Sequence, residues 1–284
     1  MENTLLSLGH GYSARTLARL LLPIGWRVIG TVRDQDKSDE IAAEGVQPLI
    51  WPGANLATAL NGATHLLTSI APGSDGDPVL KALTDGIIAA PNLKWVGYLS
   101  TTAVYGDHQG GWVDETTPVT PATKRGQWRV QAENQWRDLA QKQGLSLHIF
   151  RLAGIYGPNR GPLSKVKNGT ARRIIKDNQV FSRIHVDDIA QTLLASVNKP
   201  NPGAVYNVCD DLAAPPEDVI AYAAEVLKMP VPPAQNWADA DMTPMARSFY
   251  AESKRVRNDR IKSELGVVLK YPDYRSGLQA LADT

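Results

Sequence analysis

The sequence has very little cysteine. Cys209 is the one cysteine among 284 residues. A single thiol excludes an intrachain disulfide framework and any multi-cysteine zinc site, and it is typical of a reducing compartment. We therefore expect no metal centre built on cysteines.

Long hydrophobic runs are also missing. The longest apolar stretches fall well short of the roughly 20 residues that a membrane span needs. The first apolar run, Leu5–Leu8, is too short for a signal-peptide core and has no basic flank. These features predict a cytoplasmic protein without a membrane partner.

The chain lacks an excess of either charge. It has 30 Lys and Arg residues against 29 Asp and Glu residues, for a net charge of +1. Such a balance argues against nucleic acid as a partner, because nucleic-acid binding depends on clustered positive charge. The basic run Arg247–Lys262 is interrupted by acidic residues, so we interpret it as a solvated surface.

What is present is an alternation of short apolar strands and helical patterns, which predicts an α/β fold with a Rossmann-like, doubly wound parallel sheet. We expect residues 1–153 to form this dinucleotide-binding body, with a strand at 204–208 returning to it. Residues 154–203 and 209–284 are expected to form mainly a small C-terminal α/β substrate lobe. Asp77 and Pro78 predict the start of a helix that extends to about Ala90.

A glycine-rich turn follows the first predicted strand, Thr4–Leu8. It has the pattern GxGxxA, with Gly9 at the tight turn, Gly11 where a pyrophosphate approaches the backbone, and Ala14 where helix and strand pack closely. The turn opens a helix, whose free N–H groups and positive dipole end attract phosphate. The pattern therefore predicts a dinucleotide site that includes Tyr12 and Ser13.

The second predicted strand, Arg27–Val32, is followed by Arg33 and Asp34. An acidic side chain at this place holds the ribose 2′-hydroxyl of NAD, whereas an arginine accommodates the 2′-phosphate of NADP. We favour NADP, with NAD as the alternative, because the planar donors of Arg33 suit a phosphate.

Four later segments carry a family resemblance. In chain order they are YLSTTAVYG at 98–106, Asp114-Glu115 with Pro118 and Pro121, RLAGIYGP at 151–158, and RIHVDDIA at 183–190. In this order they resemble the extended short-chain dehydrogenase/reductase family of the NAD-dependent epimerase/dehydratase type. The resemblance covers nearly the whole chain and is more specific for the fold than for a reaction.

The resemblance implies roles for individual positions. Thr101 matches a hydroxyl residue that faces a substrate carbonyl or hydroxyl. Ser69, Ala71 and Pro72 belong to a segment that matches the loop beside the adenosine half of the cofactor. Arg183 and His185 match the strand that enters the substrate lobe.

One departure from the family concerns catalysis. The family uses Tyr-x-x-x-Lys with a glutamate four residues after the lysine, and anchoring on Glu133 places Arg129 at the lysine position and Arg125 at the tyrosine position. Arginine does not shuttle protons near neutral pH. Arg129 would still hold ribose hydroxyls, and Arg125 would bind an anionic substrate group or lie on the helix surface. The chain therefore resembles the atypical branch of the family.

Three side chains are candidates to replace the missing phenol. Tyr105 and Tyr156 each precede a glycine, a context that often positions a loop, and the imidazole of a histidine such as His185 ordinarily titrates near pH 7. For Asp187 and Asp188 we favour a capping role at a helix that begins at Ile189.

These observations favour an NAD(P)-dependent oxidoreductase or epimerase acting on a small hydroxyl or carbonyl substrate, such as a sugar or nucleotide sugar. The missing tyrosine leaves a second hypothesis open, in which the protein binds NADP(H) as a non-catalytic sensor or assembly factor. The sequence is compatible with a homodimer.

Overall fold

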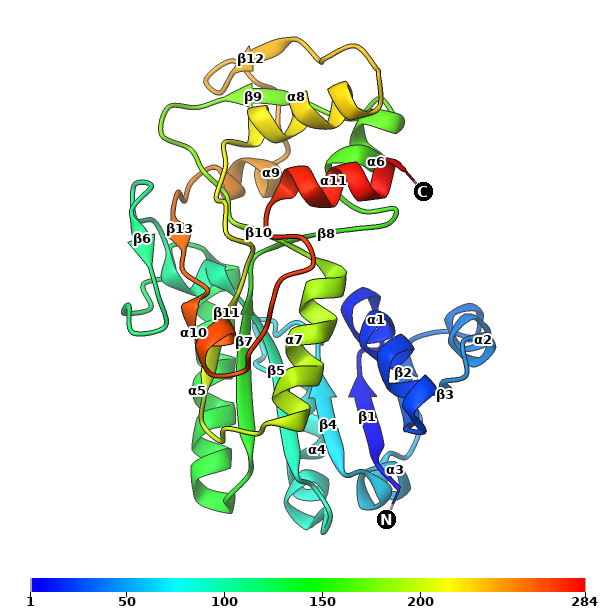
Figure 1. Cartoon of the computed structure of the whole chain (residues 1–284). Coiled ribbons are helices and arrows are strands. Elements are labelled where there is room, and N and C mark those ends of the chain that lie inside the picture. Colours follow the sequence, from blue (N-terminus) through cyan, green and yellow to red (C-terminus); the bar gives the residue numbers. More distant parts are fainter. Residues whose placement is uncertain (1, 284) are drawn as a thin grey trace. The chain divides into compact units, whose positions relative to one another are not determined.

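The computed structural model describes residues 2–283 and is built around one seven-stranded sheet (Figure 1). Its strand order is β11-β7-β5-β4-β1-β2-β3. The strands are β1 (Thr4–Leu8), β2 (Arg27–Val32), β3 (Gln47–Ile50), β4 (His65–Thr68), β5 (Trp95–Thr101), β7 (Leu147–Leu152) and β11 (Val205–Val208). The sheet is parallel, which confirms the predicted Rossmann-like α/β class. Among residues 2–283, no helix is both long enough and apolar enough to cross a membrane.

Helices cover both faces of this sheet, as a parallel sheet requires (Figure 1). One face buries Leu6, Leu8 and Leu66 against Ala132 and Trp136 in a core cluster shared with three helices. These helices are α3 (Ala57–Gly62), α4 (Pro78–Ala89) and α5 (Lys124–Gln143). The other face carries α1 (Tyr12–Leu21) and α7 (Val186–Asn198), and α2 (Gln35–Ala43) follows β2.

Contacts divide the chain into two compact units. The first consists of residues 2–101, 127–151 and 189–206, and the second of residues 102–126, 152–188 and 207–283. The second unit packs α6, α8 and α11 around a core that contains Tyr156, Leu163, Val219 and Leu278. Its strands form the parallel pairs β8–β10, β9–β12 and β6–β13. That this unit serves as a substrate lobe stays a prediction.

The elements of the second unit are short. Its strands are β6 (Trp112–Val113), β8 (Gly154–Tyr156), β9 (Arg173–Ile175), β10 (Arg183–His185), β12 (Ala234–Asn236) and β13 (Arg255–Val256). Its helices are α6 (Pro162–Lys167), α8 (Pro216–Val226), α9 (Pro244–Phe249), α10 (Asp259–Ser263) and α11 (Tyr274–Ala282).

The predicted cap of α4 is confirmed. The Asp77 carboxylate accepts the backbone N–H groups of Val79 and Leu80 at 2.8 and 3.2 Å. Its other oxygen accepts the indole N–H of Trp136 at 3.1 Å. One buried carboxylate therefore starts α4 and ties it to α5.

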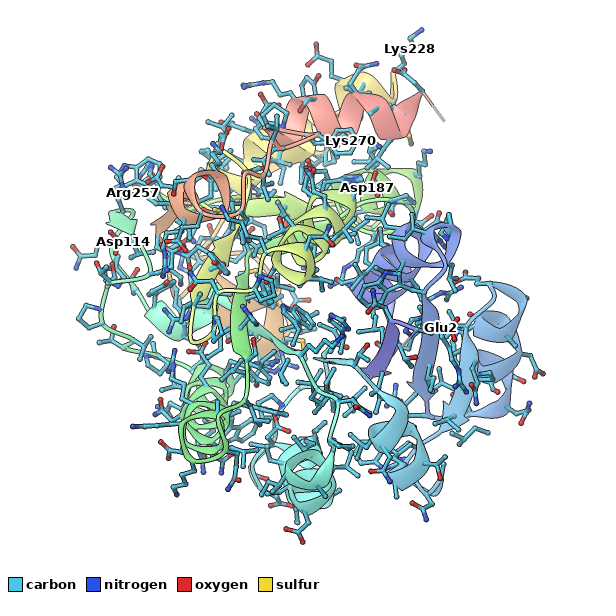
Figure 2. The ribbon with its side chains drawn as sticks, turned by 60° about the horizontal axis from the view of Figure 1, so that its bottom comes forward. Glu2, Asp114, Asp187, Lys228, Arg257 and Lys270 are labelled. Atoms are coloured by element: carbon cyan, nitrogen blue, oxygen red, sulfur yellow. The ribbon has the colours of Figure 1, made fainter. Side chains whose placement is uncertain are left out.

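The predicted capping role of Asp187 and Asp188 is wrong. Helix α7 begins at Val186, so both residues lie in its first turn. Asp188 is buried and accepts the backbone N–H groups of Lys270 and Tyr271 at 2.7 and 3.1 Å. Asp187 pairs with the Lys270 ammonium at 3.0 Å (Figure 2). The two carboxylates hold the segment before α11, a long-range role that a local pattern does not reveal.

Four buried histidines make the fold sensitive to acid. Burial lowers the pKa of His10, His65, His148 and His185 to about 4. The ordinary value is about 6.5, so an unfolded chain takes up protons first as the pH falls. The stabilisation is fully present above pH 6.5 and is lost as the pH falls towards 4.

We therefore expect the free energy of unfolding, measured with urea, to be lower at pH 5 than at pH 7.5. The loss should be roughly 1–2 kcal/mol for each buried histidine. His148→Gln should reduce the pH dependence. Equal stability at the two pH values would contradict this account.

Candidate functional site

The β1–α1 turn is built on a glycine that no other residue replaces easily. Gly9 has φ +80°, and a Cβ atom there would lie 2.7 Å from Ile70 Cγ1 and 3.0 Å from Ser69 Oγ. Its N–H donates to Thr31 Oγ1 at 2.8 Å, and the Ser69 hydroxyl donates to its carbonyl oxygen. The ends of β1, β2 and β4 therefore fix the turn from three sides.

The space above Gly11 is open. A Cβ atom added there would meet nothing nearer than the Gly9 carbonyl oxygen, at 3.9 Å. Gly11 is the N-cap of α1, no side chain caps the helix, and its first turn holds no acidic residue. This end of the helix therefore offers backbone N–H groups and its positive dipole to an anion. Tyr12 is half-buried, and Ser13 is buried.

The residue between the two glycines, His10, packs inward. A Cβ atom at Gly30 would lie 2.6 Å from the His10 ring, so the ring lies directly over β2. Both ring nitrogens are buried without a hydrogen-bond partner among the described residues. The ring thus acts as a neutral wedge between the turn and β2. The GxGxxA pattern allows any residue at position 10, so the sequence did not predict this inward packing of the His10 ring.

Arg33 and Asp34, which follow β2, have separate surroundings. Asp34 is the N-cap of α2, and its carboxylate accepts the backbone N–H of Lys37 at 2.9 Å. Arg33 is exposed and has no ion pair or hydrogen bond within residues 2–283. The nearby Arg15, in contrast, binds Glu44 and Glu40. Arg33 is therefore the basic group at this edge that remains available.

The other residues predicted to lie beside adenosine belong to the loop after β4. Ser69 is anchored to the glycine turn, as described above. Ala71 is exposed and Pro72 is half-buried. Both residues are therefore accessible to solvent close to the anchored Ser69.

Arg129 on α5, the residue predicted to match the family lysine, lies against the end of β5. Its guanidinium donates to the Leu99 carbonyl oxygen at 2.8 Å and to the Tyr98 hydroxyl at 3.0 Å. Tyr98 is fully buried, and burial raises the pKa of its phenol above the usual range. Tyr98 therefore stays a neutral hydrogen-bond partner. Thr101 is half-buried and is the last residue of β5.

One turn further along α5, Glu133 lies at the centre of a buried ionic network. Its carboxylate binds the Arg151 guanidinium through contacts of 2.8 and 3.1 Å and the Arg137 guanidinium at 2.9 Å. Ser100 Oγ donates to it at 2.5 Å. The glutamate that served as the anchor in the sequence therefore locks α5 to β5 and β7.

Four candidates lie in the second unit. Arg125 is exposed. The buried Tyr105 hydroxyl donates to Asn207 Oδ1 at 2.7 Å, and the Tyr156 hydroxyl donates to the Asp273 carbonyl oxygen at 3.4 Å. His185 Nδ1 accepts the Asp187 backbone N–H at 3.1 Å. Within this unit, each of these three groups thus has a hydrogen-bond role.

Comparison with known proteins identifies one matching family model and several similar proteins. The model of the NAD dependent epimerase/dehydratase family matches residues 78–209. A structure of a functionally unknown conserved protein from Silicibacter pomeroyi DSS is 64% identical, with a TM-score of 0.94 over 99% of this chain and 98% of that one. Protein YeeZ of Escherichia coli K12 is 27% identical over 93% of this chain and 95% of its own.

Enzymes of known activity share the fold at lower identity. UDP-glucuronic acid 4-epimerase from Bacillus cereus, in complex with NAD, has a TM-score of 0.77 and 16% identity over 99% of this chain and 97% of that one. The matched family model, the parallel sheet and the glycine turn at the end of β1 agree. The central part of the chain, residues 78–209, thus matches the NAD dependent epimerase/dehydratase family.

Proposed function

We propose that the protein binds NADP(H) at the β1–α1 turn and acts as an oxidoreductase or epimerase on a small hydroxyl or carbonyl compound. The observation that carries this proposal is the glycine turn, where Gly9 is sterically required and the space above Gly11 is open. Any side chain at position 11 would fill the space that a pyrophosphate needs to approach the backbone. The turn therefore fits the cofactor.

The proposed cofactor contacts follow from this fit. The backbone of Gly9, Gly11, Tyr12 and Ser13 would hold the pyrophosphate. Ser69, Ala71 and Pro72 would lie beside the adenosine half, and Thr101 and Arg129 towards the nicotinamide half. When bound, the nicotinamide ring supplies or accepts the hydride.

Arg33 supports NADP over NAD. Because Asp34 is occupied as the cap of α2, the unpaired guanidinium of Arg33 is the group left to meet a 2′-phosphate. We expect Arg33→Ala to weaken NADPH binding about tenfold, which corresponds to about 1.4 kcal/mol, and to leave NADH binding unchanged. Fluorescence titration with both cofactors measures this. An equal loss for both, or no loss for NADPH, would remove Arg33 from the proposed site.

The proposed catalytic residues are Thr101, Arg125, Arg129 and Tyr105. The Thr101 hydroxyl would hydrogen-bond the reacting substrate oxygen. Arg129 would supply a fixed positive charge and hold ribose hydroxyls, since arginine keeps its proton. Arg125 would bind an anionic part of the substrate. Tyr105 carries the phenol proposed for proton exchange, at the expense of its bond to Asn207.

Turnover tests this proposal. The purified protein with NADP⁺ or NADPH would be followed at the reduced-nicotinamide absorbance band against sugars and nucleotide sugars, and epimerised products would be sought by NMR. We expect one substrate class to react, and Thr101→Val to react much more slowly than Thr101→Ser. Failure of every substrate with a protein that binds NADPH would contradict the enzymatic part.

A second function has its own supporting observation. Arg129 and Arg125 stand where the family has lysine and tyrosine, and Arg129 is already bound to Tyr98 and Leu99. A protein without its proton relay would bind NADP(H) as a sensor or assembly factor. Tight NADPH binding without any turnover would favour this alternative.

A further inference from the structure

Arg183 in β10, within the second unit, uses only one nitrogen of its guanidinium for hydrogen bonds to the described residues. Its Nη1 donates to two backbone carbonyl oxygens, those of Phe181 at 2.9 Å and Ala214 at 3.1 Å. These two residues form an isolated β-bridge, so the guanidinium braces it from one end. The remaining donors, Nε and Nη2, have no acceptor within residues 2–283.

No carboxylate pairs with Arg183 in the described part of the chain. The acid next to it is Asp210, whose backbone N–H donates to the Arg183 carbonyl oxygen at 2.7 Å. Asp210 is 2% exposed, and its Oδ2 is buried without a partner. Burial raises the pKa of Asp210 to about 8, so this carboxyl is largely neutral at pH 7. Within residues 2–283, Arg183 therefore has no carboxylate in ion-pair contact.

A second acid lies within electrostatic reach. Glu217, at the start of α8, interacts with both Arg183 and Arg173, and burial raises its pKa. Its Oε2 is also buried without a hydrogen-bond partner. Neither acid forms an ion pair with Arg183, which is half-buried.

We propose that the free Nε–Nη2 edge of Arg183 binds a carboxylate or phosphate group of the substrate. The planar Nε–Nη2 edge can donate two parallel hydrogen bonds to the two oxygens of such a group. The hydrogen bonds from Nη1 to the two carbonyl oxygens fix the orientation of the guanidinium. The inference rests on the proposed function, which it deepens by assigning an anionic substrate class.

Three probes that share one sugar ring test this inference. Glucose is neutral, glucuronate adds a carboxylate, and glucose 1-phosphate adds a phosphate. With the full chain, we expect calorimetry to give at least tenfold tighter binding of one of the two anions than of glucose. The anion that binds more tightly identifies the chemical source. Equal binding of all three, or binding of none, would overturn the inference.

Variants then assign the preference to this residue. Arg183→Gln should abolish the preference, and the surface variant Arg257→Gln should keep it, because Arg257 is exposed and pairs with Asp259. If Arg183→Gln does not fold, Arg183→Lys is tested instead. Lysine keeps a donor for the two carbonyls but lacks the planar edge, so we expect at least a fivefold loss. A preference that survives in the folded variant would overturn the inference.

NADPH titration of the same samples separates the two proposals. Absence of an anion preference in the unmodified protein, with normal NADPH binding, would overturn the role of Arg183 alone. An intact anion preference in a protein that does not bind NADPH would overturn the proposed function alone.

Discussion

Replacement of Gly11 by valine is expected to abolish NADPH binding in a protein that still folds. Gly11 has an extended backbone with φ −100°, which any residue adopts, and the nearest atom to a new Cβ is 3.9 Å away. The change should cost at most about 1 kcal/mol of stability. The valine side chain would, however, fill the space that a pyrophosphate needs. We expect NADPH affinity to fall about 100-fold, equivalent to about 2.7 kcal/mol.

Gly9→Ala is the matched comparison, because it should damage folding as well. Alanine at φ +80° is strained, and its Cβ would overlap Ile70 Cγ1 at 2.7 Å, so we expect about 2–4 kcal/mol of destabilisation. Urea unfolding and NADPH fluorescence titration on both variants measure the two effects separately. Normal NADPH binding by Gly11→Val would contradict the assignment of the turn.

The second large effect is expected at Glu133. The side chains of Glu133 and Arg151 are 1% and 4% exposed. Glu133→Ala would leave the Arg151 charge buried without its partner, which typically costs about 3–5 kcal/mol. The same change would release Ser100 from α5. We therefore expect a large loss of stability in urea unfolding, together with weaker cofactor binding, because α5 also carries Arg129.

Two controls identify the cause. Glu44→Ala removes a partly exposed partner of Arg15 and should cost at most about 1 kcal/mol. Glu133→Leu combined with Arg151→Met removes both buried charges, and it should be more stable than Glu133→Ala because no charge is left unpaired. Equal stability of Glu133→Ala and Glu44→Ala would show that the buried Glu133–Arg151 pair stabilises the fold no more than the partly exposed Glu44–Arg15 pair does.

The sequence was informative where the deciding interactions are local. The turn at Gly9–Ala14 and the Asp77 cap are set by residues within a few positions of each other, and both could be predicted. The alternation of strands and helices likewise predicted the parallel sheet. The family resemblance offered Glu133 as an anchor, and the match of Arg129 and Arg125 to the family lysine and tyrosine stays a prediction.

Long-range contacts could not be predicted in the same way. Asp188 reaches the backbone of Lys270, and Arg183 reaches Ala214, over separations that no periodic pattern encodes. The inward packing of His10 depends on Gly30, on the neighbouring strand. The choice between Arg33 and Asp34 likewise required knowing that Asp34 caps α2.

The most direct test of the account is a crystal structure of the protein with NADPH. The account predicts the pyrophosphate against the backbone of Gly9, Gly11 and Ser13, with the 2′-phosphate on the Arg33 guanidinium. A cofactor bound elsewhere, or a 2′-phosphate without contact to Arg33, would contradict it.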